Sequence, residues 1–343
     1  MPMSGPLAAY GQVTNLGVEL AHKQQPTLKN GDTIKIVLLD NKGDKVETAT
    51  ATTRLISSDK VVAILGALTS TNTAQAIAIA DKKEIPVIAS VATNDQLTAK
   101  REFANRVCFT DSFQGEVVAN YAKAQAYKTA VVVVDQSQVY SLGLAKAFET
   151  AFKKNGGEIV KTIKITSGDK DFKAVVSQIK ETNPDFMFLP LYHPEASMIA
   201  RQSKQLGLEK PMFSGDGVAN QTFIDLGGDA VNGYMFTDFF DYTNPPSQKS
   251  ADFVAYHEKE TGKAEMNSFT ALGADTYNIL IDAMNRCEDP TNSVCINEQI
   301  KKTTDFDGVS GKITINKEGN ATRSAVIKEV KDGKAVFKAT VNP

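Results

Sequence analysis

The sequence contains no tryptophan, and it has only three histidines and three cysteines among its 343 residues. His22, His193 and His257 have no spacing to one another or to cysteine that is typical of a metal site. His22 and His257 fall on polar faces of expected helices, whereas His193 follows an expected strand, where a side chain can lie near a ligand. We therefore expect no metal and no cofactor.

Motifs that hold nucleotides or carry nucleophiles are also missing. No G-x-G-x-x-G follows a strand, and neither G-x-x-x-x-G-K-[ST] nor G-x-S-x-G occurs. Gly311-Lys312 lacks the partner glycine and the following serine or threonine of a phosphate-binding loop. An enzyme would need a nucleophile beside a base, and no such pair stands out. We expect the chain not to be an enzyme.

Charge of one sign is not in excess, and long apolar runs are absent. The 38 Lys and Arg residues nearly balance 40 Asp and Glu residues, for a net charge of -2. This balance gives no electrostatic reason to expect binding to nucleic acid or to an anionic membrane surface. The longest apolar runs, such as residues 130–134, are far shorter than the roughly 18 residues that a membrane helix needs, and residues 130–134 predict a buried strand.

What the sequence does contain is a regular alternation of apolar strand-like runs and amphipathic helical runs. Such strands, apolar along their whole length, are typical of parallel sheets covered on both faces. Two sets follow one another, which predicts an α/β fold of two doubly wound parallel-sheet lobes, as the length also suits. Expected strands are 34–39, 61–65, 86–90, 106–110, 130–135, 159–165, 185–191 and 212–214, with helices at 47–57, 72–82, 115–126, 142–154, 172–181 and 195–206.

The last third of the sequence departs from this alternation. An apolar run at 234–241 precedes three expected helices, and the chain ends in strands joined by a hairpin at Asp332-Gly333. We expect this part to return between the lobes and not to form a third domain. The helices are 250–261, 270–286 and 296–303, and the strands are 311–315, 325–329 and 334–340.

Cys287 and Cys295 bracket the turn-rich residues 288–294. This spacing predicts a disulfide that closes a small loop, which fits an oxidising compartment. The alternative is two unpaired thiols in a loop. Cys108 lies among apolar residues and is expected to be a buried strand residue.

Three polar clusters follow expected strands, where ligands bind in open α/β sheets. They are residues 70–73, 90–94 and 215–217. The hydroxyls of the first cluster are suited to capping a helix, and the same helix end can hold a carboxylate through backbone N–H groups. Asp216, flanked by glycines, is either an ordinary turn residue or the one carboxylate that meets a ligand ammonium.

Five segments together resemble the periplasmic amino-acid-binding proteins of the leucine/isoleucine/valine type, with type I periplasmic binding folds. The resemblance extends over essentially the whole chain, and no single motif carries it alone. The segments are 3–11 (MSGPLAAYG), 66–73 (GALTSTNT), 87–93 (VIASVAT), 192–195 (YHPE) and 213–218 (FSGDGV).

The resemblance implies roles for the polar residues. Ser70 and Thr93, with the backbone near Val91, would hold the α-carboxylate and α-amino group of an amino acid. Asp216 stands where the family has an acidic partner for the ammonium, although aspartate is shorter than the family's glutamate. A strand also precedes the first loop in the family, and only Met1–Met3 precede it here, so we expect the native chain to continue upstream with that strand and a signal peptide.

The resemblance also assigns aromatic residues to the ligand. Tyr10 would flank it from the first lobe, Tyr140 and Tyr192 would close from the second, and Phe269 would line the side-chain pocket. Around Tyr140 the loop is one residue longer than in the family. These rings favour leucine, isoleucine or valine, while phenylalanine, alanine or a small polar amino acid remain open alternatives.

The family's organisation implies three crossings between the lobes. We expect lobe 1 to comprise residues 1–111 and 241–317, and lobe 2 to comprise 112–240 and 318–343. The implied function is capture of an amino acid by hinge closure and delivery to the membrane permease of an ABC importer, by a monomeric periplasmic protein. The alternative is a sensor or binding protein for an amide or another small solute.

Overall fold

The computed structural model describes residues 1–343 and divides them into two compact units. Unit 1 comprises Met1–Thr110 and Phe239–Ser324, and unit 2 comprises Asp111–Asp238 and Ala325–Pro343. The crossings therefore follow Thr110, Asp238 and Ser324, where the sequence predicted residues 111, 240 and 317. The last one falls later because β10 (Gly311–Ile315) pairs with β11 (Ala321–Thr322) and keeps the hairpin between them in unit 1.

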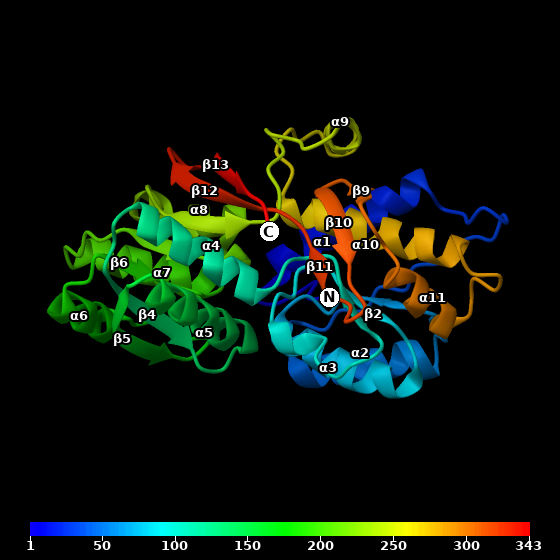
Figure 1. Cartoon of the computed structure of the whole chain (residues 1–343), viewed down its shortest axis with the longest axis horizontal. Helices are drawn as coiled ribbons and strands as arrows, with labels where there is room; N and C mark the ends of the chain where they lie inside the picture. The colour runs from blue at the N-terminus through cyan, green and yellow to red at the C-terminus, as the bar shows by residue number, and fades with distance from the viewer. The chain divides into compact units, whose positions relative to one another are not determined.

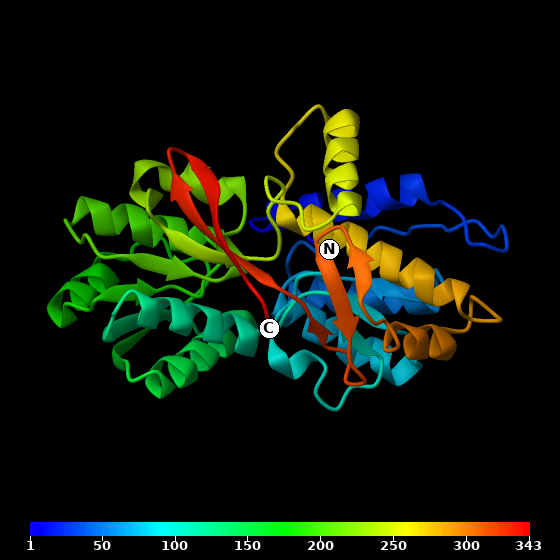
Figure 2. The same ribbon diagram turned by 45° about the horizontal axis from the view of Figure 1, so that its top comes forward.

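Unit 1 contains a short parallel sheet and a separate antiparallel sheet. The parallel sheet has the order β1-β2-β3, and helix pairs α1/α10 and α2/α3 lie on either side of it (Figure 1). The antiparallel sheet has the order β11-β10-β9, and α9 projects from the rest of the unit (Figure 2). The elements are α1 Ala8–Gln24, α2 Lys45–Ser57, β1 Ile64–Leu65, α3 Ser70–Ala80, β2 Val87–Ala89, β3 Ala104–Arg106, α9 Gln248–Thr261, α10 Ser268–Asn285, α11 Ser293–Ile300 and β9 Phe306–Gly308.

Two glycines explain the close packing of α1 on α10. A Cβ atom on Gly17 would lie 1.9 Å from the carbonyl oxygen of Thr270, and one on Gly273 would lie 2.1 Å from that of Thr14. Only glycine permits such an approach of two backbones. The hydroxyl of Thr270 donates to the carbonyl of Val13 at 2.9 Å across the same contact.

Unit 2 is built on one seven-stranded sheet of order β13-β12-β8-β7-β6-β4-β5. Strands β4 to β8 are parallel, as predicted, and the hairpin of β12 and β13 adds an antiparallel edge. The elements are α4 Asp111–Ala124, β4 Thr129–Asp135, α5 Val139–Lys154, β5 Glu158–Ile165, α6 Lys173–Thr182, β6 Phe186–Phe188, α7 His193–Gln205, β7 Met212–Ser214, α8 Gln221–Gly227, β8 Met235–Asp238, β12 Ala325–Lys331 and β13 Lys334–Val341.

Local sequence accounts for several of these elements. The four valines of β4 are buried, as expected of a β-branched strand covered on both faces. Asp44 caps α2 by accepting hydrogen bonds from the amides of Val46 and Glu47. Asp332 and Gly333 both have positive φ angles, which is the type I′ geometry of a two-residue hairpin.

Two expected strands differ from the structure. Residues 34–39 are extended but have no strand partner, and Ile36 and Leu38 are 36% and 43% exposed. β-Branched composition favours a strand only where a neighbouring strand supplies hydrogen bonds. Here the backbone bonds lie at the two ends of the segment, where Ile34 donates to the carbonyl of Pro26 and Met1 donates to the carbonyl of Leu39. The strand expected at 106–110 is instead β3, because Ala89 pairs with Arg106 and the chain then leaves the sheet.

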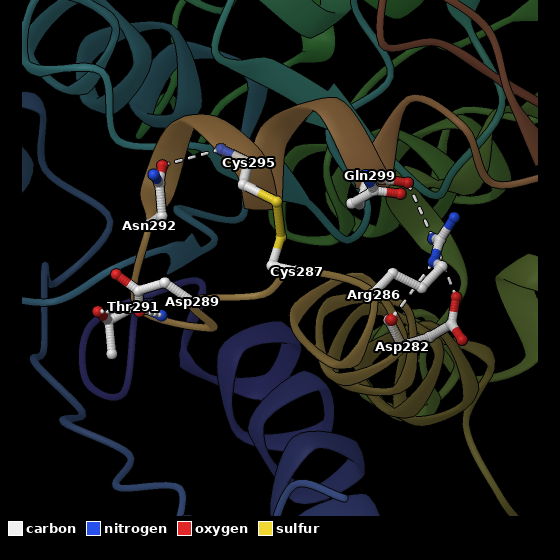
Figure 3. Close-up of a disulfide and its surroundings, with 8 residues drawn as sticks. All are labelled: Asp282, Arg286, Cys287, Asp289, Thr291, Asn292, Cys295 and Gln299. Carbon is white, nitrogen blue, oxygen red and sulfur yellow. Dashed lines mark hydrogen bonds and ion pairs between the residues drawn. A yellow bond between two sulfur atoms is a disulfide. The ribbon is translucent and has the colours of Figure 1, made fainter. Parts of the chain in front are cut away.

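Cys287 and Cys295 form a disulfide, as predicted, and it joins the loop after α10 to the first turn of α11 (Figure 3). Asn292 caps α11 by accepting from the amide of Cys295 at 3.0 Å. On the α10 side, Arg286 pairs with Asp282 at 2.9 Å and donates to the carbonyl of Gln299 at 2.9 Å. Cys108 is buried and lies outside the disulfide.

The segments next to the crossings carry buried charged residues in each unit. In unit 1, Arg323 donates to the carbonyls of Phe239 and Ser310, and Ser310 donates to the buried carboxylate of Asp275. In unit 2, Lys328 pairs with Asp238. No helix has the length and apolar character needed to cross a membrane, and no cluster of metal-ligating side chains is present.

Candidate functional site

The predicted polar residues of unit 1 meet at the carboxyl ends of β1 and β2. Ser70 begins α3, and Val91 and Thr93 lie in the loop that follows β2. The amide of Asn94 donates to the Ser70 hydroxyl at 3.3 Å, which joins the two loops. This bond uses an acceptor position of the serine and leaves its O–H proton for another partner. The parallel strands thus place Ser70 and the Val91–Thr93 backbone beside each other.

Two polar groups in this part of unit 1 are buried without a hydrogen-bond partner. They are the hydroxyl of Thr93, whose residue is 0% exposed, and the side-chain amide nitrogen of Asn72 in the first turn of α3. Burying such a group unpaired costs about 1 to 3 kcal/mol, so a ligand oxygen placed there would relieve the cost. The start of an α-helix also favours an anion. The arrangement suits a carboxylate.

The loop after β2 is held from beneath by a residue that sequence reasoning missed. The fully buried guanidinium of Arg106 donates to the carbonyl oxygens of Ala92 at 3.2 Å and Asn94 at 2.7 Å. The Cys108 thiol also donates to the Ala92 carbonyl, at 3.2 Å. A charged residue inside an apolar strand was the signal available in the sequence, because burial of arginine demands carbonyl or carboxylate partners.

Aromatic rings form a second part of the candidate site in unit 1. Tyr10 of α1 stacks on Phe269 of α10 with ring centroids 5.5 Å apart, and Phe239 lies 5.7 Å from Phe269. Thr276, two turns after Phe269 on the same face of α10, bonds the hydroxyl of Ser90 at 3.0 Å. One helix face therefore connects the aromatic wall to the polar loop at roughly 10 Å along the helix axis.

In unit 2 the structure brings Tyr140, Tyr192 and Asp216 together. Tyr140 stacks on Tyr192 with centroids 5.0 Å apart, and its hydroxyl accepts from the amide of Gly217 at 3.0 Å. A Cβ atom on Gly215 would lie 2.6 Å from the Tyr140 hydroxyl. The Gly-Asp-Gly sequence is thus explained by close packing, since neither glycine has a positive φ angle.

Asp216 is a buried carboxyl group whose hydrogen bonds come from neutral donors. Burial raises its pKa to about 7, and the charge of Asp238 adds to this shift, while hydrogen bonds from Gln114 and Tyr140 oppose it. Such a carboxylate is best stabilised by a cationic group of a ligand. His193, the first residue of α7, is also buried, and burial lowers its pKa to about 4, so it is neutral at physiological pH.

Gln114 is the second residue that sequence reasoning missed. Its amide bonds both the carboxylate and the backbone of Asp216. The available signal was its position four residues before Val118 and eight before Ala122, all three buried on one face of α4. A polar side chain on an apolar helix face needs a polar partner.

The polar loops of unit 1 and the Asp216 group of unit 2 are two half-sites on one chain, and the sequence of that chain matches a family model. The model of the periplasmic binding protein family matches residues 1–335. The chain belongs to this family. The predicted α/β fold and the resemblance to leucine/isoleucine/valine-binding proteins are both confirmed.

Individual members of the periplasmic binding protein family are similar to this chain over nearly its full length. A Leu/Ile/Val-binding protein of Rhizobium johnstonii, BraC3, is 28% identical over 94% of this chain and 87% of its own length. The crystal structure of a leucine-binding protein of Thermotoga maritima is 37% identical, with a TM-score of 0.97, covering 100% of this chain and 97% of that one. A branched-chain amino acid binding protein of Streptococcus pneumoniae in complex with isoleucine is 31% identical, with a TM-score of 0.91, covering 99% and 97%.

Proposed function

We propose that this chain binds one amino acid, with leucine, isoleucine and valine preferred, and delivers it to the membrane permease of an ABC importer. Membership of the periplasmic binding protein family and the named ligands of its relatives support this proposal. Their agreement over almost the whole chain also supports a periplasmic location. The chain would bind its ligand without turning it over, and ATP would be hydrolysed by another protein of the importer.

The observation that carries the proposal is the complementary chemistry of the two half-sites. Unit 1 has the Ser70 hydroxyl at the start of α3 and the unpartnered Thr93 hydroxyl in the loop after β2, which suit an anion. Unit 2 has the buried Asp216 carboxyl among neutral donors, which suits a cation. A zwitterion carries both groups, and their burial would strengthen each charge-assisted hydrogen bond.

The rings of the site support an apolar side chain on the ligand. Tyr10 and Phe269 form an uncharged stacked wall, and the Tyr140–Tyr192 stack forms another in unit 2. Branched aliphatic side chains gain about 25 cal/mol for each Å² that they bury against such walls. Because each unit of a single chain has one half of the required groups, we also propose that the protein acts as a monomer.

Calorimetric titration with the twenty amino acids tests the proposal. Leucine is then compared with leucinamide, which lacks the carboxylate, and with 4-methylpentanoate, which lacks the ammonium. We expect each analogue to bind at least about tenfold more weakly, the equivalent of about 1.4 kcal/mol. Absence of binding by any amino acid would overturn the proposal, and equal or tighter binding of leucinamide would favour an amide sensor. Conversion of the bound amino acid, followed by NMR, would show an enzyme.

A further inference from the structure

Gln114 is the side chain that bonds both the carboxylate and the backbone amide of Asp216. The amide nitrogen of Gln114 donates to Asp216 Oδ1 at 2.9 Å, and its carbonyl oxygen accepts from the backbone amide of Asp216 at 2.7 Å. Gln114 thus holds both ends of the residue, which fixes the Asp216 side-chain rotamer as well as its backbone. The Gln114 side chain is 0% exposed.

The orientation of the Gln114 amide follows from its partners. The backbone N–H of Asp216 can only donate, so the carbonyl oxygen of Gln114 must face it. The hydroxyl of Thr237 in β8 donates to the same oxygen. The NH₂ group is then directed at the carboxylate, where it stabilises the ionised form.

Gln114 therefore connects three parts of unit 2 beside the Asp216 carboxylate. It stands on α4, Asp216 follows β7, and Thr237 belongs to β8. A Cβ atom on Gly215 would lie 2.8 Å from the Gln114 carbonyl oxygen, so the chain before Asp216 is shaped to admit this amide. A leucine of similar volume would fill the space and make none of the three bonds.

We propose that Gln114 is the positioning residue of the ammonium site: it orients Asp216 and keeps its carboxylate available to the cationic end of the ligand. This inference rests on the proposed function, and it adds a residue that touches Asp216 and not the ligand. Preorganisation of this kind raises affinity because the acidic group need not be ordered when the ligand arrives.

The other charged and titratable groups around Asp216 are few. Tyr140 of α5 bonds its carboxylate, and Asp238 of β8 raises its pKa. Asp238 is itself paired with Lys328 of β12. The charge of Asp111, at the start of α4, and that of Tyr192 raise the pKa of Tyr140. The hydrogen bond from Gln114 has the largest effect among those that lower the pKa of Asp216 and so favour its ionised form.

The test compares Gln114→Leu with a matched control in the same unit. Gln202 also makes two hydrogen bonds, accepting from the amide of Phe172 at 2.6 Å and donating to the carbonyl of Lys170 at 2.9 Å, so Gln202→Leu removes equivalent bonds at a site without Asp216. Leucine affinity is measured by calorimetry from pH 5 to 9 for the native protein and both variants. We expect Gln114→Leu to lose about tenfold or more in affinity at neutral pH, while Gln202→Leu stays within about twofold.

The pH profile separates positioning from a merely structural role. Loss of the Gln114 donor should raise the pKa of Asp216, so the midpoint of the affinity profile should move to higher pH in Gln114→Leu and remain unchanged in Gln202→Leu. Gln114→Asn, which is too short to make both bonds, provides a second variant with the same expected direction, should the leucine variant not fold. Native-like affinity and midpoint in either Gln114 variant that folds would overturn the proposal. If the native protein itself binds no amino acid, the proposed function fails instead.

Discussion

Asp238 and Lys328 form a buried ion pair of 2.8 Å, with side chains that are 3% and 8% exposed. They lie on β8 and β12, two neighbouring antiparallel strands that each adjoin a crossing between the units, and they are diagonal neighbours in the register. Removing one partner of a buried ion pair costs about 3 to 5 kcal/mol. Lys328→Met should therefore lower the melting temperature of the ligand-free protein markedly, as measured by circular dichroism.

The double variant Asp238→Asn with Lys328→Met is the control for this pair. Because it removes both charges, it should recover most of the stability lost in the single variant. Equal melting temperatures for the single and double variants would show that the charge of Asp238 is not what destabilises the protein.

Thr93→Val should weaken leucine binding and stabilise the ligand-free protein. The Thr93 hydroxyl is buried without a partner, so an isosteric methyl group removes a desolvation cost of about 1 kcal/mol. The same change removes a donor from the proposed carboxylate site, so affinity should fall about tenfold. Calorimetry and thermal unfolding measure the two effects separately.

Thr73→Val is the matched control for Thr93→Val. The Thr73 hydroxyl accepts from the amide of Ala67 at 3.1 Å, so its loss leaves a buried N–H unpaired and should lower stability by about 1 kcal/mol. Stability changes of the same sign in the two variants would contradict the assignment of Thr93 as an unpaired donor.

Leucine affinity should depend on pH through Asp216. Its pKa is raised to about 7, so below that value the ammonium meets an increasingly protonated carboxyl group, and affinity should fall by up to about tenfold for each pH unit. Above pH 7 the affinity should level off. Calorimetric titration from pH 5 to 9 checks this, and Asp216→Asn should bind weakly with no such slope.

The stability of the ligand-free protein should show the opposite trend. The folded-state pKa of Asp216, about 7, lies above its ordinary value of 3.8. The contribution of Asp216 to stability is therefore fully present below pH 4 and is lost as the pH rises to about 7. His193, with a pKa lowered from 6.5 to about 4, opposes this slope below pH 6.5. The difference between native protein and Asp216→Asn isolates the aspartate, and a pH-independent difference would exclude the raised pKa.

Replacing Cys287 and Cys295 with serine should destabilise unit 1. The disulfide closes a loop with a sequence separation of 8, for which chain entropy predicts about 2 to 3 kcal/mol. Thermal unfolding of the double variant should resemble that of the native protein treated with dithiothreitol. If reductant lowers the melting temperature of the variant as well, the effect does not come from this disulfide.

Sequence patterns predicted the elements whose residues carry their own signal. The buried valines of β4 and the Asp332-Gly333 turn were confirmed, as was the disulfide. Residues 34–39 have equally good strand composition, yet they form no ladder because a strand depends on a partner that composition does not supply.

The candidate site divides in the same way. Ser70, Thr93 and Asp216 follow strands, so their positions at the carboxyl ends of the parallel strands were predictable. Their contact with a ligand stays a prediction. Gln114 and Arg106 were missed because their roles arise from segments that meet only in the folded protein. Gln114 meets a loop about a hundred residues later in the chain, and no local pattern encodes that distance.

The packing of α1 on α10 has a consequence for how the protein is made. Thr270 and Val13 bond across this contact although they are 257 residues apart in the chain. While the polypeptide is being synthesised from its N-terminus, the apolar face of α1 therefore stays uncovered until most of the chain has emerged. The α1–α10 packing of unit 1 therefore forms late, and completion of this unit should be slow and dependent on protection from aggregation during that interval.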